Sequence, residues 1–422
     1  MASLNYDGLT TPILPDKDPV IKRQARVIIT MLQFYPDHPS GSARLAYDEA
    51  ILLATQGHEV WVITQDADGN RPEYSTHKGL HVLRYPRLQL SLYDVRKLWS
   101  HQLQTRRSLS RFIKLPVDLI HGHSLLNYDG AISLYGKSVR KCYSVHSPVR
   151  MELLADSRGV SVPRRFHHIL AGNIAHYLER RCLQRSDAVT VFSEYSHALI
   201  SKIYGRKIFN KSRNIPGWVD LSNYQILSDQ HSIKIELGWP TNVPVFFTLR
   251  RLVPRMGLDR LLYALRRVTS EGWTFQYYLA GSGPLEHDLQ ELAIKLKIAD
   301  RVHFLGKIPD GLLPRMYAAA DAFVLPTAEL ECFGLTAIEA LACGRPVLAT
   351  PVGAIPEVIG QVEPNWLAES NGVESISQLL INFLKGKLPS HDPLSLRRFV
   401  AERYSMERAL LKLTAYAMGE SQ

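Results

Sequence analysis

The sequence is poor in cysteine, and it has no long apolar run. Its four cysteines, among 422 residues, form no C-x-x-C pair and no metal-ligand spacing, which excludes a disulfide scaffold and is typical of a reducing cytoplasm. No stretch approaches the roughly 18 apolar residues that span a bilayer. The first 25 residues also lack the apolar block of a signal peptide. We therefore expect a cytoplasmic protein, with any membrane contact peripheral and at the inner face.

Tandem repeats and low-complexity tracts are absent as well. Hydrophobic residues make up 45% and charged residues 21%, so disorder, collagen and a coiled-coil rod are excluded. The 50 basic and 40 acidic residues give a net charge of +10, which favours an anionic partner: a phosphorylated small molecule, a nucleic acid or an acidic membrane. Because the chain lacks an aromatic–basic RNA-binding signature and a finger motif, we expect no nucleic-acid partner.

Short apolar runs alternate with segments of helical period, and this pattern occurs twice along the chain. The first set predicts an extended arm before residue 23, a helix over 42–56, and strands at 26–34, 58–64, 79–84, 117–121, 141–146 and 187–192. The second set predicts a helix over 257–268, two final helices that break at Tyr404 and Ser405, and strands at 243–249, 275–280, 302–305, 322–325 and 346–349. Since a single core stops growing at roughly 250–300 residues, we expect an α/β protein with two doubly wound parallel sheets.

One segment, residues 326–346, has the sequence P-T-A-E-L-E-C-F-G-L-T-A-I-E-A-L-A-C-G-R-P. Glu339 lies inside an apolar helix, where an unpaired carboxylate would lose several kcal/mol of solvation, so Glu339 needs partners. Ribose hydroxyls and protein donors would serve equally. The free amides at the helix start, from Phe333 to Leu335, suit a phosphate or sugar oxygen. Taken alone, a satisfied structural Glu339 and an exposed loop Glu331 explain the segment as well.

The whole arrangement resembles a known family. Glu331 and Glu339 form an E-x7-E pair that encloses F-G and precedes A-x-x-C-G-R-P-V. Further segments of the chain carry the same resemblance, in this order: Y-P-D-H-P-S-G-S-A-R, L-A-T-Q-G-H-E-V-W-V-I-T, V-D-L-I-H-G-H-S, S-V-H-S, S-D-A-V-T-V-F-S, L-R-R-L-V-P-R-M-G-L-D, L-A-G-S-G-P-L and V-H-F-L-G. Together they resemble family 4 of the retaining nucleotide-sugar glycosyltransferases, which have the GT-B fold of two Rossmann-like domains facing across a cleft.

The resemblance implies a division of the chain and a set of site residues. Residues 1–222 would form the acceptor domain and residues 223–404 the donor domain, with a helix at 405–422 packing back on the first. Catalytic roles are implied for His146, Glu331 and Arg251. Donor-binding roles are implied for Gly41, Arg250, Arg251, Arg255, Gly283, Glu331, Phe333, Gly334, Leu335 and Glu339, and an acceptor-side role for His123. From the residues alone, Gly41 as a turn glycine and His146 as a structural histidine stay open.

The phosphate-binding segment departs from the family pattern G-R-L-x-x-x-K-G. Here Arg251 is kept, but Arg250 stands for the glycine and Met256 for the lysine. We expect Arg250 or Arg255 to replace the missing charge, because a guanidinium grips phosphate bidentately; the alternative is that Arg255 is a solvated surface charge. A second departure is Trp218, where the family usually has a glycine near the interdomain linker.

The implied reaction moves a hexosyl group from a UDP- or GDP-sugar to a hydroxyl of a glycan, a glycolipid precursor or a small metabolite, with retention of configuration. No trio of His, Asp and Glu has metal-ligand spacing along the chain, so neither a metal nor a cofactor beyond the nucleotide-sugar is expected. The competing functions are an epimerase or hydrolase of the same fold and a non-catalytic sugar-nucleotide-binding protein. The basic segment 94–114 is interpreted either as a contact for anionic lipid or a phosphorylated acceptor, or as a solvated helix that covers the sheet.

Overall fold

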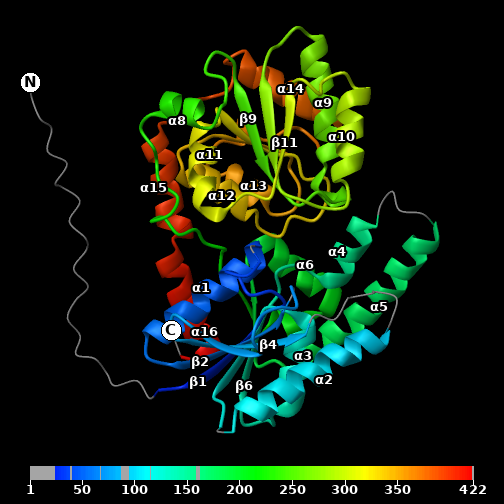
Figure 1. Ribbon diagram of the computed structural model, residues 1–422, viewed down its shortest axis with the longest axis vertical. Coiled ribbons are helices and arrows are strands. Elements are labelled where there is room, and N and C mark those ends of the chain that lie inside the picture. The colour runs from blue at the N-terminus through cyan, green and yellow to red at the C-terminus, as the bar shows by residue number, and fades with distance from the viewer. Residues whose placement is uncertain are drawn as a thin grey trace, which may run out of the picture.

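The computed structural model describes residues 24–38, 40–66, 68–86, 95–114, 116–157 and 162–420. The described chain forms two domains, each built on its own sheet, that lie one above the other along the long axis of the molecule (Figure 1). The expected extended arm before residue 23 lies outside the described residues.

The N-terminal domain contains an eight-stranded sheet in the order β3-β4-β2-β1-β5-β6-β7-β8. Neighbouring strands run parallel except for β3 and β4. The strands are β1 (Arg26–Thr30), β2 (Glu59–Asp66), β3 (Tyr74–His77), β4 (Leu80–Pro86), β5 (Leu119–Gly122), β6 (Arg140–Ser144), β7 (Ala188–Val191) and β8 (Ser212–Asn214). Their carboxyl ends meet at one edge, where ligands of doubly wound sheets bind.

Helices cover both faces of this sheet. The helices that the described residues of this domain form are α1 (Gly41–Thr55), α2 (Val95–Phe112), α3 (Leu125–Leu134), α4 (Val149–Asp156), α5 (Val162–Arg185), α6 (Glu194–Tyr204) and α7 (Arg206–Phe209). Alternate residues of β1 enter opposite cores: Ile28 packs with the core that contains Tyr128 of α3, and Ile29 packs with the core that contains Ala50 of α1. Burial on both faces explains the continuous Val and Ile runs of these strands.

The C-terminal domain contains a five-stranded parallel sheet in the order β11-β10-β9-β12-β13. Its strands are β9 (Val245–Leu249), β10 (Gln276–Ala280), β11 (Val302–Gly306), β12 (Ala322–Leu325) and β13 (Val347–Ala349). Its α-helices are α8 (Gln230–Glu236), α9 (Leu258–Ser270), α10 (Glu286–Lys295), α11 (Leu313–Ala319), α12 (Leu335–Ala342), α13 (Ile355–Ile359), α14 (Val373–Leu384) and α15 (Pro393–Tyr404). Short 3-10 turns occur at η1 (Pro254–Met256), η2 (Asp310–Leu312) and η3 (Pro364–Trp366).

The chain crosses between the domains twice, and the two crossings lie side by side. Val219 in the first crossing donates its amide to the carbonyl of Tyr404 in the second, and Met406 donates back to Val219. After this bridge, α16 (Met406–Met418) packs on the N-terminal domain, as Figure 1 shows in red. Arg140 at the start of β6 fixes the end of α16 by donating to the carbonyls of Tyr416 and Ala417.

The two doubly wound sheets and the break between the last two helices confirm the sequence predictions, with most strand boundaries moved by one to three residues. The first strand was predicted too long: it ends at Thr30, and residues 32–38 turn across the edge of the sheet. Two strands were not predicted. β3 alternates exposed and half-buried polar residues, and β8 has only three residues, so neither carries an apolar run.

Candidate active site

The N-terminus of α12 faces the N-terminus of α1 across the two domains. Gly334 caps α12 in the left-handed region, at φ 95°, which a side chain would strain. Among the described residues, the amides of Phe333, Gly334 and Leu335 donate no hydrogen bond. A Cβ placed on Gly41 would lie 3.1 Å from Cδ1 of Leu335. The structure thus brings four predicted donor residues together and leaves three amides available to an anionic or hydroxyl ligand.

Glu331, in the loop before α12, is held by a buried arginine. Nη2 of Arg250 lies 2.5 Å from Oε2 of Glu331 and 2.9 Å from the hydroxyl oxygen of Thr327. The side chains of Arg250 and Glu331 are both largely buried. Glu331 is therefore not the exposed loop carboxylate that one interpretation of the sequence allowed. The charge of Arg250 is neutralised by Glu331 in this ion pair.

Glu339 is partly buried among groups from both domains. Tyr317 donates to Oε2 of Glu339 at 2.7 Å, which supplies the protein donor that the sequence required. Burial raises the pKa of Glu339 to about 7, although hydrogen bonds from Tyr317 and Tyr224 and the charge of Arg44 favour the ionised form. Arg44 belongs to α1 and donates to Tyr35, whose hydroxyl in turn contacts Asp310 of the C-terminal domain. The second glutamate of the motif thus lies where the domains touch.

Arg251 and Arg255 pair with two carboxylates of α4 across the cleft. Nη2 of each arginine lies within 2.8 Å of Oε1 of Glu152, at 2.6 Å for Arg251 and 2.8 Å for Arg255. Asp156 adds a contact of 3.0 Å to Nε of Arg255. Arg255 is only 9% exposed, so the interpretation of it as a solvated surface charge is wrong, whereas Arg251 is 54% exposed. Met256 is buried in the core and leaves these arginines as the local cations.

Glycines in the loop after β10 allow that loop to pack against the segment that carries Arg250, Arg251 and Arg255, called here the arginine loop. A Cβ on Gly281, which has φ 122°, would lie 1.8 Å from the carbonyl oxygen of Arg250, and a Cβ on Gly283 would lie 2.4 Å from that of Leu252. Such contacts do not occur, so only glycine fits at both positions. The observed role of Gly283 is thus to position the backbone that carries Arg250 and Arg251.

His146 follows β6 and lines a cavity of about 290 Å3 in the N-terminal domain. Its ring stacks on Phe192, with centroids 4.8 Å apart, and its Nε2 lies 3.1 Å from Nδ1 of His123. The polar residues that line the cavity include Ser42, His123, His146 and Glu152. Aliphatic side chains supply much of the rest: Leu32, Leu125, Leu126, Val149, Leu153, Ala171, Ala175 and Leu178. The cavity therefore adjoins the arginine cluster through Glu152 and the α1 N-terminus through Ser42.

Beneath His146 lies a buried carboxylate that the sequence interpretation missed. Glu49 of α1 is fully buried and contacts His121 and His123. Spacing along the chain did not reveal this cluster, because the fold brings α1 next to β5. Ligand atoms of the three residues lie within 4.8 Å of one another. A glutamate on the buried face of an amphipathic helix was the available signal.

Trp218 and its neighbour Gly217 lie in the first interdomain crossing. Trp218 is buried and donates from Nε1 to Oδ2 of Asp48 on α1 at 3.1 Å. A Cβ on Gly217 would lie 2.6 Å from the ring of Phe333. The tryptophan that departs from the family pattern thus anchors the crossing to α1. The adjacent glycine leaves room for the ring of Phe333.

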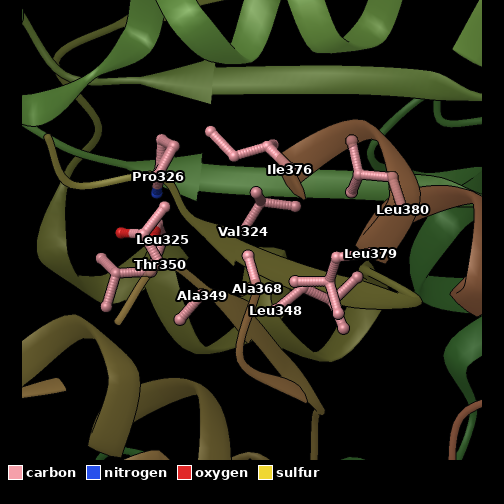
Figure 2. Close-up of a pocket in the computed structure, with 10 residues that line it drawn as sticks. All are labelled: Val324, Leu325, Pro326, Leu348, Ala349, Thr350, Ala368, Ile376, Leu379 and Leu380. Atoms are coloured by element: carbon pink, nitrogen blue, oxygen red, sulfur yellow. The ribbon is translucent and has the colours of Figure 1, made fainter. Parts of the chain in front are cut away.

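A second void, in the core of the C-terminal domain, is too small to bind a substrate. Figure 2 shows its lining of mainly aliphatic side chains, among them Val324 and Leu325 of β12, Leu348 of β13, and Leu379 and Leu380 of α14. Its volume of about 10 Å3 is close to the room that one water needs. We regard it as imperfect packing between the sheet and α14.

The basic helix α2 exposes apolar as well as charged side chains. Trp99 and Leu103 are 63% and 46% exposed, and Arg106 and Arg107 on the following turn are also exposed. Residue 94 and the side chains of residues 95–98 lie outside the described residues. Within the described ranges, no helix is both long enough and apolar enough to cross a bilayer.

Comparisons with known proteins match both domains. Residues 39–223 match the family model described as Glycosyltransferase Family 4, and residues 229–398 match the one described as Glycosyl transferases group 1. Sucrose-phosphate synthase from Thermosynechococcus elongatus superposes with a TM-score of 0.77 at 21% identity, over 93% of this chain and 98% of that one. This likeness shows the GT-B fold.

Two curated relatives are similar in sequence. A GDP-mannose-dependent monoacylated alpha-(1-6)-phosphatidylinositol monomannoside mannosyltransferase of Corynebacterium glutamicum is 30% identical over 206 residues, which cover 47% of this chain and 53% of that protein. A 2-deoxystreptamine glucosyltransferase of Streptomyces kanamyceticus is 24% identical over 315 residues, covering 72% of this chain and 78% of that protein. The chain thus spans about half the length of the first relative.

Proposed function

The chain belongs to glycosyltransferase family 4, and from this membership we propose that it transfers a hexosyl group from a UDP- or GDP-sugar to an acceptor hydroxyl with retention of configuration. One observation carries the proposal. The residues that line the cavity with His146 include Ser42 and Glu152. Ser42 follows Gly41, which meets the side chain of Leu335 at the start of α12, and Glu152 pairs with Arg251. A donor at α12 and an acceptor in the cavity would therefore meet near His146.

The donor would use amides that the structure leaves free and charged side chains that now pair with protein carboxylates or tyrosines. The three free amides at the start of α12 suit phosphate or hexose oxygens, and the carboxylate of Glu339 suits ribose hydroxyls. Charge that develops on the departing diphosphate would be stabilised by Arg251 and Arg255. Both arginines now pair with Glu152, so the donor would replace one anionic partner with another. Arg250, committed to Glu331, would position that glutamate beside the hexose.

For the acceptor we propose a lipid-linked hydroxyl. The Corynebacterium relative is named as a mannosyltransferase of a phosphatidylinositol monomannoside. Two observations on this chain support the same class: the largely aliphatic cavity beside His146, and the exposed Trp99 and Leu103 next to Arg106 and Arg107 on α2. Apolar side chains combined with basic ones on one helix favour an anionic membrane surface.

The donor assignment is tested with a panel of UDP-, GDP- and ADP-sugars, each scored by thermal shift and by slow release of free nucleotide. We expect one UDP- or GDP-sugar to stabilise the protein and to be hydrolysed slowly, and Glu339→Gln to weaken that stabilisation. Recovery of an epimerised sugar nucleotide from an incubation without acceptor would identify an epimerase instead. Binding with no turnover in the presence of any hydroxyl acceptor would identify a sensor.

The acceptor assignment is tested by sedimentation with anionic and neutral vesicles at low salt. We expect pelleting with anionic vesicles only, and loss of pelleting in Trp99→Ser combined with Leu103→Ser. The matched control is Ile294→Ser on α10, which removes a similarly exposed apolar side chain from the C-terminal domain. Absence of pelleting with wild type, together with transfer to a soluble phosphorylated sugar, would exclude the lipid acceptor.

A further inference from the structure

Four side chains form a continuous chain of hydrogen bonds that runs from the wall of the proposed acceptor cavity into the core. Oε1 of Glu49 lies 2.6 Å from Nδ1 of His121, and Oε2 lies 2.8 Å from Nε2 of His123. Nδ1 of His123 lies 3.1 Å from Nε2 of His146. Glu49 belongs to α1, His121 lies in β5 with His123 just after it, and His146 follows β6, so three elements must pack correctly to build this hydrogen-bond chain. Only its last member, His146, is more than slightly exposed.

In this row of hydrogen bonds, donor and acceptor atoms can be assigned by starting from Glu49, its buried carboxylate. An ionised carboxylate only accepts hydrogen bonds. Burial opposes ionisation of Glu49, yet the neighbouring His121 and His123 lower the pKa of Glu49 below its ordinary value. Both histidines therefore donate to it, His121 from Nδ1 and His123 from Nε2. On the far side, His121 meets the hydroxyl of Ser144, which itself contacts Thr190, so hydroxyls complete that end.

The position of the proton on His146 follows from that on His123. Burial lowers the pKa of His123, so its ring is neutral; since Nε2 carries the proton, Nδ1 must accept. Nε2 of His146 must therefore be the donor. Burial, and after it the nearby histidines, hold the pKa of His146 well below its ordinary value, so that this ring too is neutral and its Nδ1 carries no proton. No hydrogen bond to Nδ1 of His146 is present among the described residues.

We propose that Glu49, acting through His123, is a positioning residue that fixes the tautomer of His146, so that Nδ1 of His146 presents a lone pair to a substrate hydroxyl in the cavity. His146 then acts as a hydrogen-bond acceptor at that nitrogen and not as a donor. The proposal rests on the proposed function only for the identity of the hydroxyl. The tautomer itself follows from the hydrogen bonds.

A metal ion is the competing explanation for Glu49, His121 and His123. Zinc lies about 2.0–2.2 Å from each nitrogen or oxygen ligand, which places neighbouring ligand atoms of a tetrahedral site well over 3 Å apart. Here Oε1 of Glu49 lies only 2.6 Å from Nδ1 of His121, and Oε2 of Glu49 only 2.8 Å from Nε2 of His123. Both distances are those of hydrogen bonds. The same distances that exclude an ion between them support shared protons.

The tautomer is measured directly by long-range 15N–1H correlation on the full chain labelled with 15N-histidine. His146→Gln assigns the signal, because one of the 16 histidine ring systems then disappears. We expect wild-type His146 to show a protonated Nε2 and a bare Nδ1 at neutral pH. A protonated Nδ1, or a doubly protonated ring, would overturn the proposal. Unchanged spectra on addition of Zn2+ or a chelator are expected, and a shift of the Glu49-linked rings would favour the metal.

Activity gives the second readout. We expect Glu49→Gln to lower kcat by about tenfold or more with little change in the donor KM, because orientation is lost while donor contacts remain. The matched control is Glu363→Gln, which alters another buried glutamate that accepts from a histidine, His391, in the C-terminal domain. Equal kcat in Glu49→Gln and wild type, with an unchanged His146 spectrum, would contradict the positioning role.

A pair of His123 variants covers the case in which Glu49→Gln does not fold. The side-chain oxygen of Asn lies close to the place of the histidine Nδ1 and accepts from His146 without help from Glu49. We therefore expect His123→Asn to keep the His146 tautomer in the spectrum, and His123→Leu to lose it. Equal loss in the two variants would indicate packing alone. If no donor is turned over at all, the proposed function fails, while the spectra still decide the tautomer.

Discussion

Gly41 and Leu335 meet across the cleft, with only 3.1 Å between Cδ1 of Leu335 and the place of a Cβ on Gly41. The first residue of α1 thus touches the first residue of α12, one from each domain. Gly41 has an ordinary φ, so the requirement for glycine here comes from the approach of the two domains and not from backbone strain.

A larger side chain at this contact should therefore impair activity more than stability. We expect Gly41→Val to lower kcat/KM by about tenfold or more, because even a small displacement of α12 should slow catalysis. Gly41→Ala should have a weaker effect, since the end of Leu335 can rotate away. Steady-state kinetics and thermal unfolding measure the two quantities. The control is Gly136→Val, where no heavy atom lies within 4 Å of the added Cβ; an equal loss there would refute the contact.

Arginine replacements test how the chain compensates for Met256. We expect Arg255→Ala to lower kcat/KM by about tenfold or more, since a preorganised charge at the diphosphate is lost, and Arg255→Lys to recover part of it. Arg250→Ala should also lower turnover, through release of Glu331. Arg267→Ala removes an exposed arginine paired with Glu374 and serves as the control. If Arg250→Ala and Arg255→Ala each lose no more than about threefold, neither replaces the lysine.

The pKa of Glu339, raised by burial to about 7 from an ordinary 4.5, predicts two pH effects of opposite sign. Donor binding should weaken as the pH falls through about 7, because the protonated carboxyl accepts fewer hydrogen bonds from ribose. Stability should instead decrease as the pH rises from 4.5 through about 7, because the folded state binds the proton more tightly than the unfolded state. Glu339→Gln should remove the pH dependence of donor binding and reduce that of stability, to which the raised pKa of the buried Glu179 also contributes; donor titrations and melting curves across this range measure both. A flat wild-type profile would contradict the shift.

Glu152 should restrain donor binding, because its carboxylate already occupies Arg251 and Arg255. We expect Glu152→Gln to bind the nucleoside diphosphate several-fold more tightly at low salt, and the gain to shrink as salt screens the competing charges. Isothermal titration measures both. Asp300→Asn, which removes an exposed carboxylate of the same domain as the arginines, is the control. Weaker nucleotide binding in Glu152→Gln would mean that the carboxylate organises the arginines and does not compete for them.

The sequence was sufficient to predict the two sheets, because their strands and helices depend on local runs of residues. The need of Glu339 for a partner was also predictable, since an apolar helix cannot leave a carboxylate unpaired. The identity of its partners was not: Tyr317 lies in another helix, and Arg44 in the other domain. Glu49 shows the same limit, because its two histidine partners lie 72 and 74 residues away.

The arginine loop illustrates a different limit. The sequence around Arg250, Arg251 and Arg255 indicates positive charge for a phosphate. It does not indicate which carboxylates neutralise that charge in the folded protein. Glu152 and Asp156 belong to α4, in the other domain, and no local pattern links them to η1. Burial of Arg255 likewise follows from closure of the domains.

The bridge between Val219 and Ser405 has a mechanical consequence. Two covalent connections that lie side by side allow rotation about the line through them and resist twisting and sliding of one domain past the other. Each opening of the cleft should therefore follow nearly the same arc, and each closure should return α12 to the same place above α1. A chain cut after Tyr404 would keep one connection and lose this guidance. The C-terminal helix would thus guide the relative motion of the domains, although none of its residues lines the cavity.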